Sequence, residues 1–306
     1  MNSNFGGLII VLSIIGIALL GGLKNKESVF TPNPPTVMTV VPPPPAVINP
    51  SVNPPKSPQQ QITELQRKVE DLKKQVSAEQ AKQFASEYKD IVDLSFIVRS
   101  PDPKNEYLTM RVTKTLEKPV RVTGWSIRSS ENGTSVYIST GAYYYTNTIV
   151  NTEEDIYLDN NDTLYLISGT SPVGTSFKTN RCTGYLSHIR TFIPALKNNC
   201  PLAKNEDLSS IARTRENEQC LNYIDTISSC RIQKTTLPAN WSQECKKFLY
   251  EKLNYTSCFN AHRNDFNFFG DEWMIYLNRN TRMWSSGRDT LTLYDNLGKI
   301  VDTLNI

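Results

Sequence analysis

Residues 107–129, YLTMRVTKTLEKPVRVTGWSIRS, decide the fold class of this chain. Leu108, Met110 and Val112 alternate with polar residues, which is the period of a β-strand with one buried face. The same alternation resumes after a short polar turn and slips by one position at Thr123-Gly124. The slip predicts a β-bulge at that point, and the whole stretch predicts a mainly β domain.

Segments of the same kind lie on both sides of this stretch. Leu94, Phe96 and Val98 are predicted to share one buried face of the first strand. Asn132-Gly133 and Gly298 are typical turn residues between strands. Further alternating segments occur at residues 135–138, 156–167, 273–279, 289–295 and 299–304. About nine short strands with short turns predict an antiparallel sandwich or barrel.

Two of these segments resemble a known family. Residues 106–133, EYLTMRVTKTLEKPVRVTGWSIRSSENG, followed by SVYIS, resemble the first half of a lamin-tail domain. The C-terminal RDTLTLYDNLGKIVDTLNI is similar to the last hairpin of that family. The resemblance covers roughly 94–180 and 272–306. It implies an immunoglobulin-like antiparallel β-sandwich over 92–306, as in membrane-anchored bacterial lamin-tail proteins.

All six cysteines lie in one short region that this resemblance does not cover. The cysteines are Cys182, Cys200, Cys220, Cys230, Cys245 and Cys258. An even, clustered set predicts three disulfides and an oxidising compartment, whereas the alternative is a set of reduced buried thiols. Fifteen pairings are possible, and loop closure slightly favours neighbours: Cys182–Cys200, Cys220–Cys230 and Cys245–Cys258.

The cysteines belong to a predicted insertion in the β domain, residues 181–270. Two of its segments, 205–227 and 240–254, have helical spacing, and Ser242 is the expected N-cap of the second. We therefore expect a helical excursion held together by disulfides, because so small a unit has little core of its own.

The N-terminus carries an apolar run behind a four-residue tail, residues 1–4. Residues 5–23, FGGLIIVLSIIGIALLGGL, contain no charge, and a helix of that length rises roughly 28 Å, enough to cross a bilayer. A signal anchor is favoured over a cleaved signal peptide, because no basic residue precedes the run and no cleavage site follows it. Lys24 and Lys26 would place the C-terminal part in the cytoplasm. The cysteines and the next segment favour an extracytoplasmic position.

Residues 24–61 are rich in proline and are predicted to form an extended stalk. Eleven of the 18 prolines lie between 27 and 61, and such a segment favours polyproline II over a packed core. The alternative is a proline-rich ligand for an adaptor domain.

Residues 62–90 predict a helix with an apolar seam. The seam repeats at spacings of three and four and consists of Ile62, Leu65, Val69, Leu72 and Val76. It predicts either self-association through residues 62–76 as a short coiled coil or packing on the following domain. In a parallel pair, Lys68 and Lys73 would repel each other.

The composition gives little material for catalysis or for nucleic-acid binding. Net charge is +3 and the chain has only two histidines, so no basic face is predicted for nucleic acid. No cofactor motif is present. A zinc site from Cys220, Cys230, Cys245, Cys258 and His262 lacks the usual paired spacing. Asp159, Asn160, Asn161 and Asp162 fit a polar turn better than a calcium loop. We expect no metal and no cofactor.

The tyrosine run Tyr143-Tyr144-Tyr145 is the remaining candidate for a binding surface. Aromatic residues are also ordinary in strands, so core packing is the alternative. The sequence predicts a noncatalytic cell-surface protein that presents a β-sandwich module on a stalk to a protein, glycan or cell-envelope partner. The alternative is a surface hydrolase with an unrecognised site in the cysteine-rich insertion.

Overall fold

The computed structural model describes residues 57–146, 150–285 and 287–306. The predicted tail, the predicted anchor 5–23 and nearly all of the stalk lie outside the described residues. Within the described ranges, no helix combines the length and the apolar character needed to cross a membrane. The folded domain lies within Ile62–Ile306.

Helix α2 runs from Pro58 to Phe84. Its start is fixed by a capping box: the Gln60 amide donates to Ser57 Oγ (3.3 Å), and the Ser57 amide donates to Gln60 Oε1 (3.0 Å). Pro58 then occupies the first helical position, where its missing N–H costs nothing. The helix thus begins four residues earlier than predicted, inside the predicted stalk, and ends six residues earlier. None of its residues is buried.

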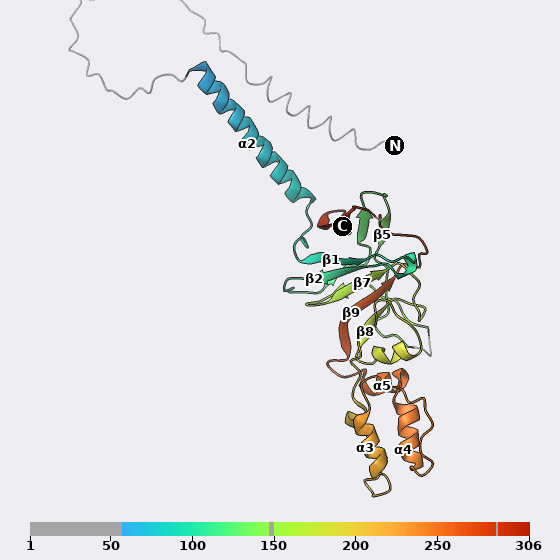
Figure 1. Ribbon diagram of the computed structural model, residues 1–306. Helices are drawn as coiled ribbons and strands as arrows, with labels where there is room; N and C mark the ends of the chain where they lie inside the picture. Colours follow the sequence, from blue (N-terminus) through green and yellow to red (C-terminus); the bar gives the residue numbers. More distant parts are fainter. Residues whose placement is uncertain (1–56, 147–149, 286) are drawn as a thin grey trace, which may run out of the picture. The chain divides into compact units, whose positions relative to one another are not determined.

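The β domain contains a five-stranded sheet, a four-stranded sheet and a two-stranded sheet (Figure 1). The five-stranded sheet has the order β1-β2-β7-β9-β8, the four-stranded sheet β11-β10-β4-β5, and the small sheet β3-β6. The strands are β1 (Val92–Val98), β2 (Tyr107–Val112), β3 (Val120–Arg121), β4 (Ser126–Ser129), β5 (Ser135–Tyr137), β6 (Tyr157–Leu158), β7 (Thr163–Ile167), β8 (Phe177–Asn180), β9 (Phe269–Tyr276), β10 (Thr290–Tyr294) and β11 (Ile300–Asn305).

The multi-sheet, mostly antiparallel fold expected from the sequence is confirmed, with one strand pair that differs. β7 and β9 pair in parallel, Leu164 opposite Trp273, while every other strand pair is antiparallel. The exception arises because β9 enters between β7 and β8 after a long excursion, and strands joined by a long connection can pair in parallel.

Two local predictions in the strands were wrong. In β1 the register shifts between Leu94 and Phe96, so Leu94 is buried while Phe96 is exposed. A one-residue slip sends the following side chains to the other face. At Thr123-Gly124 the chain leaves one sheet and enters another instead of forming a bulge, and Gly124 has φ +87° at this corner. Only glycine adopts that conformation without strain.

One hydrophobic core joins the five-stranded and four-stranded sheets. It combines Leu108 of β2, Trp273 of β9 and Ile127 of β4 with Leu293 of β10. Trp125, Trp273 and Trp284 are all almost fully buried, as core residues rather than ligand contacts. Each buried indole removes on the order of 200 Å² from water, which stabilises the fold by several kcal/mol.

The excursion between β8 and β9 packs on the opposite face of the five-stranded sheet and is partly helical (Figure 1). Its helices are η2 (Thr183–His188), η3 (Ala203–Asn205), α3 (Glu218–Thr226), α4 (Gln243–Lys247), the π-helix η4 (Phe248–Lys252) and α5 (Tyr255–His262). Of the predicted helix 205–227, only the last part, Glu218–Thr226, is α-helical. Ser242 caps α4 as predicted, because its side chain accepts a hydrogen bond from the Cys245 amide.

Three disulfides hold the excursion, as predicted, but the pairing predicted from chain order was wrong. The bonds are Cys182–Cys258, Cys200–Cys230 and Cys220–Cys245. Short-loop closure favours neighbours only weakly in the unfolded chain, and the folded packing decides otherwise. Cys182 follows β8 and Cys258 lies in α5, shortly before β9, so their bond closes the base of the excursion. Disulfides of this kind form and persist in oxidising, extracytoplasmic compartments.

The outer part of the excursion has its own small core, and Cys220–Cys245 lies inside it with Ile224 and Leu249. Replacing both cysteines by alanine should destabilise this part by about 3 kcal/mol, because the bond restricts a loop of 25 residues in the unfolded chain. Hydrogen exchange should accelerate by roughly 100-fold in residues 218–253 and remain unchanged in β2 and β7. Equal acceleration in the sheet would mean that the excursion and the sheet unfold as one unit.

Candidate functional site

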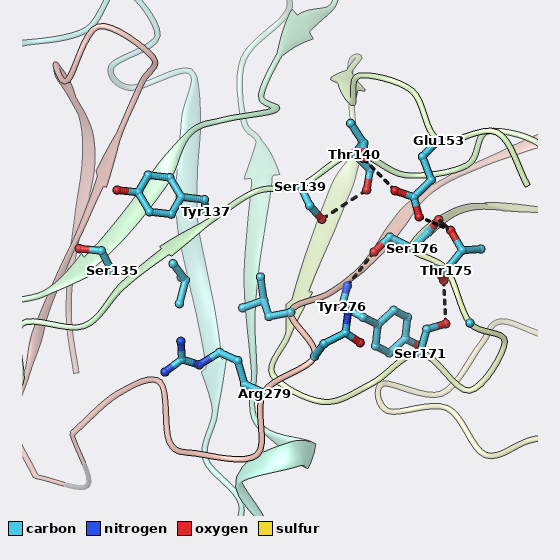
Figure 2. Close-up of a pocket in the computed structure, with 14 residues that line it drawn as sticks. Ser135, Tyr137, Ser139, Thr140, Glu153, Ser171, Thr175, Ser176, Tyr276 and Arg279 are labelled. Atoms are coloured by element: carbon cyan, nitrogen blue, oxygen red, sulfur yellow. Dashed lines mark hydrogen bonds between the residues drawn. The ribbon is translucent and has the colours of Figure 1, made fainter.

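A polar groove of roughly 420 Å³ lies between β5, the connection before β8 and the chain after β9. Its volume falls in the usual range for ligand sites. Four chain segments line it: residues 135–140, Glu153 in the connection between β5 and β6, the connection between β7 and β8, and the end of β9 with the residues after it. Figure 2 shows Ser135 and Tyr137 on one side and Ser171, Thr175 and Ser176 on the other.

The first wall comes from the edge strand β5. Gly133 has φ +68° in the turn before it, as expected for an Asn-Gly hairpin, and β5 then pairs with β4 along Ser126–Arg128. Val136 is buried in the shared core, so its neighbours Ser135 and Tyr137 face the other way. The Tyr137 ring keeps about 62% of its surface exposed and offers a free aromatic face.

The second wall is the connection between β7 and β8, which is fixed by its own hydroxyl groups. Ser171 Oγ donates to the Thr175 carbonyl (2.7 Å). Glu153 accepts from Thr140 Oγ1 and from Thr175 Oγ1, each at 2.8 Å, so one carboxylate ties the two walls together (Figure 2). Hydroxyl groups both donate and accept hydrogen bonds, so this wall can serve a ligand of either polarity.

The third part of the lining is the end of β9, residues 276–279. The Leu277 amide donates to the Ile167 carbonyl (2.9 Å) and the Arg279 amide to the Ser168 carbonyl (2.7 Å), so the chain continues alongside the residues after β7. Gly169 permits the close approach of the Lys104 backbone on its other side, because a Cβ at Gly169 would lie 2.5 Å from the Lys104 carbonyl oxygen. Asn278 has φ 53°, a conformation that asparagine tolerates better than most residues.

Two polar atoms of this third segment are buried without a hydrogen-bond partner: Tyr276 Oη and Arg279 Nε. Burial raises the pKa of the Tyr276 phenol, so the hydroxyl stays protonated and remains a donor. An unsatisfied buried polar group costs about 1–3 kcal/mol.

The groove is nearly balanced in charge and rich in groups that donate and accept. Arg279 supplies one positive charge and Glu153 one negative charge, and six serine and threonine residues complete the polar lining. Neither histidine nor cysteine lines the groove, so it lacks the usual base for activating a serine hydroxyl. This chemistry suits reversible binding of an uncharged, hydroxyl-rich molecule.

The tyrosine run does not form a single surface. Tyr143 packs against Trp273 with ring centroids 4.8 Å apart. Tyr145 is buried, and its carbonyl accepts a hydrogen bond from the Tyr255 hydroxyl (2.7 Å). Of the three tyrosines, only Tyr144 keeps about half of its surface exposed. Its ring centroid lies 5.0 Å from that of Phe269.

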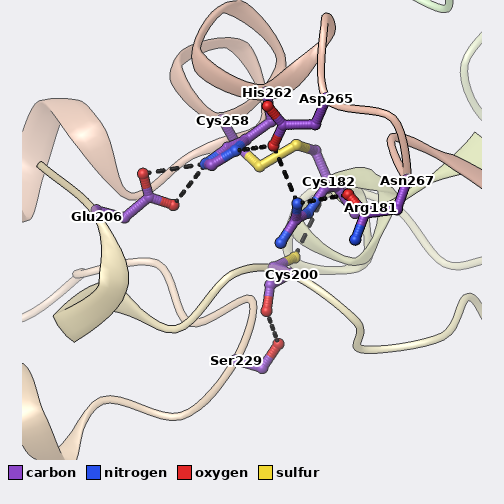
Figure 3. Close-up of polar contacts among 9 residues, drawn as sticks. All are labelled: Arg181, Cys182, Cys200, Glu206, Ser229, Cys258, His262, Asp265 and Asn267. Carbon is purple, nitrogen blue, oxygen red and sulfur yellow. Dashed lines mark hydrogen bonds and ion pairs between the residues drawn. A yellow bond between two sulfur atoms is a disulfide. The ribbon is translucent and has the colours of Figure 1, made fainter.

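A second polar cluster lies in the excursion, around His262 (Figure 3). His262 Nδ1 lies 2.8 Å from Asp265 Oδ2, and Nε2 lies 3.1 Å from both Glu206 oxygens. Arg181 Nη1 donates to the same Asp265 oxygen (3.0 Å). The cluster ties η3 to α5 and to the end of β8 beside Cys182–Cys258. We interpret it as a structural link.

The remaining sequence candidates also have structural partners. The four cysteines weighed as zinc ligands are all in disulfides, and the described residues hold no group of three or more side chains suited to a metal. In the turn weighed for calcium, Asp162 forms a buried ion pair with Lys178 (2.9 Å). Asp271 and Glu272, adjacent in β9, both contact Lys197.

Compared with protein-family models and with curated proteins, the sequence matches none of them.

None of the groove residues was singled out as a site in the sequence, because the groove draws on four separate segments. The only local indication in the sequence is the high content of serine and threonine in residues 168–179, SGTSPVGTSFKT. Its neighbours in space, β5 and the end of β9, depend on a strand order that the sequence does not reveal.

The absence of a hydrogen-bond partner for the Tyr276 hydroxyl can be tested through its effect on stability. Tyr276→Phe should leave the free energy of unfolding unchanged or raise it by about 1 kcal/mol, because no hydrogen bond is lost. Thr175→Val should lower it by about 1–2 kcal/mol, because that hydroxyl donates to Glu153. Urea unfolding of both variants measures the difference. A loss above 1 kcal/mol for Tyr276→Phe would show that the hydroxyl has a partner in the folded protein.

Proposed function

We propose that this chain is a noncatalytic, membrane-tethered binding module that acts outside the cytoplasm, and that the polar groove binds a glycan unit. The observation that carries the proposal is the lining of the groove: a half-exposed tyrosine ring, many hydroxyl groups, one amide, one guanidinium and one carboxylate. A sugar ring presents a C–H face that packs on an aromatic ring and a rim of hydroxyl groups that need both donors and acceptors.

The charge balance of the groove supports a neutral ligand over an anion or a lipid. Glu153 would repel a phosphate or carboxylate, although Arg279 alone would attract one. Apolar side chains are a minor part of the lining, with Val136 and Leu277 the main examples, so an acyl chain would bury little against it. A hydroxyl-rich ligand can also satisfy Arg279 Nε if the groove adjusts on binding.

The location follows from two independent features of the chain. The uncharged run 5–23 is the proposed membrane anchor, followed by the proline-rich stalk. Three disulfides favour an oxidising compartment for the folded domain, against the cytoplasmic position that Lys24 and Lys26 would favour. The anchor therefore enters as a signal anchor with its C-terminal side outside.

For the β domain we infer an immunoglobulin-like sandwich of the lamin-tail type. The shared core between the five-stranded and four-stranded sheets supports a sandwich. The resemblance over residues 106–133 and 288–306 supports the family. Under this proposal the disulfide-held excursion is an addition to the family fold and covers the outer face of the larger sheet.

Binding in the groove is tested by calorimetry with a panel of soluble neutral oligosaccharides of glucose, N-acetylglucosamine, mannose or galactose units. At least one should bind with a Kd of roughly 1 mM or tighter. Tyr137→Ala and Arg279→Ala should each weaken binding at least about tenfold, because they remove the stacking face and the charged donor. Arg111→Ala, at an exposed position of β2, is the matched control and should leave affinity unchanged. No binding by the wild-type chain, or equal loss in the control, would refute a glycan site in this groove.

Tethering is tested separately on membranes from cells that make the full chain. The protein should resist extraction by alkaline carbonate, and added protease should reach the folded domain on the extracytoplasmic side. Deleting residues 5–23 should release the protein from the membrane fraction. A soluble mature chain that begins near Glu27 would instead identify a cleaved signal peptide.

A further inference from the structure

Helix α2 exposes its entire apolar seam. Ile62, Leu65, Val69, Leu72 and Val76 keep between 49% and 60% of their surface in solvent, and no residue of α2 is buried. Isolated exposed apolar residues are common on proteins, but five on one side of one helix form a continuous stripe. No residue in the described part of the chain buries this stripe.

The helix has its own local stabilisation, so the seam is presented in a defined geometry. The capping box at Ser57 and Gln60 begins it. Ion pairs at i,i+4 support it, Glu64 with Lys68 (3.4 Å) and Glu70 with Lys74 (4.0 Å), and all four residues lie off the a and d positions of the seam.

We propose that α2 pairs in parallel and in register with α2 of a second copy of this chain. The pattern of the seam identifies this partner. With Ile62 at position a of a heptad, the a positions hold Ile62, Val69 and Val76, and the d positions hold Leu65 and Leu72. β-Branched residues at a with leucine at d favour a parallel two-stranded coiled coil. In an antiparallel pair of the same length, Ile62 would face Glu79 of the other copy.

Lys68 and Lys73 set the strength of this pairing. They occupy the g and e positions, so Lys68 of one copy faces Lys73 of the other. Glu64 offsets part of the repulsion, because it pairs with Lys68 within the same helix. The seam is short and carries one repulsive pair on each side, so the two helices associate weakly and reversibly in solution. Confinement of anchored chains to a membrane surface raises their effective concentration and favours the pair.

The proposal rests on α2 alone and holds whether or not the groove binds a glycan. When the groove binds a glycan and α2 pairs, the dimer presents two grooves on one pair of stalks. Two weak sites that engage one polymeric surface bind far more tightly than either site alone.

The geometry is tested by cysteine crosslinking of the full chain in its membrane, with a mild oxidant. In a parallel pair, Leu65 of one copy faces Leu65 of the other, whereas Arg67, at position f, faces outward. Leu65→Cys should give at least about fivefold more disulfide-linked dimer than Arg67→Cys, which controls for random collision and for exchange with the native disulfides. Equal yields would refute pairing through the seam. Efficient crosslinking only when Leu65→Cys and Val76→Cys chains are co-expressed would show an antiparallel pair and overturn the proposal.

The charge pattern provides an independent test on the same full chain, measured by sedimentation in detergent. Lys73→Glu converts each repulsive pair into an attraction with Lys68 of the other copy. The dimer dissociation constant should fall by about tenfold at low salt, and the gain should shrink at high salt. Arg67→Glu makes the same change of charge at position f and should leave the constant within about twofold. Equal effects of the two substitutions would contradict the parallel register.

Discussion

The insertion of β9 between β7 and β8 is the constraint on which the rest of this domain depends. β9 is buried on both faces: Trp273 and Ile275 enter the core shared by the two sheets, while Met274 and Tyr276 pack toward the excursion. A strand of this kind cannot be lost without exposing two cores at once. Replacement of a fully buried aromatic residue such as Trp273 by alanine costs about 3–5 kcal/mol, a large part of the stability of an ordinary domain.

The disulfide-held excursion and the groove both follow from this arrangement. The chain leaves the sheet at the end of β8 and must return to the position beside it, and Cys182–Cys258 joins the departing and returning segments. Because β9 runs parallel to β7, its end lies beside the end of β7, and Arg279 is brought next to Ser168. The groove therefore exists only when β9 is in place, although its lining residues are mostly polar and add little to the core.

The sequence predicted those features that depend on local alternation. β2 was predicted residue for residue, because Leu108, Met110 and Val112 follow the strand period without interruption. β8, FKTN, was missed, because it is short and holds one apolar residue. Its partners lie more than 85 residues further along the chain, at Phe269 and Met274. The register shift in β1 was also missed, since a bulge depends on the neighbouring strand.

Neither the site nor the disulfide pairing could be predicted from the sequence, and the physical reason is the same for both. Both are set by contacts between segments that no local pattern links, such as the Arg279 amide with the Ser168 carbonyl at the groove and Cys182 with Cys258 across the excursion. The tyrosine run drew attention because its residues are adjacent. Yet adjacent residues in extended chain point in opposite directions, and only Tyr144 is left half-exposed.

Hydrogen exchange of the full chain, with and without the tightest-binding oligosaccharide of the panel, tests the central claim most directly. The account predicts slower exchange in residues 135–140, 171–176 and 276–279 when the sugar is bound, because these three segments line one groove together with Glu153. The excursion beyond Cys200 should show no change. Protection confined to the excursion, or in only one of the three segments, would contradict the account.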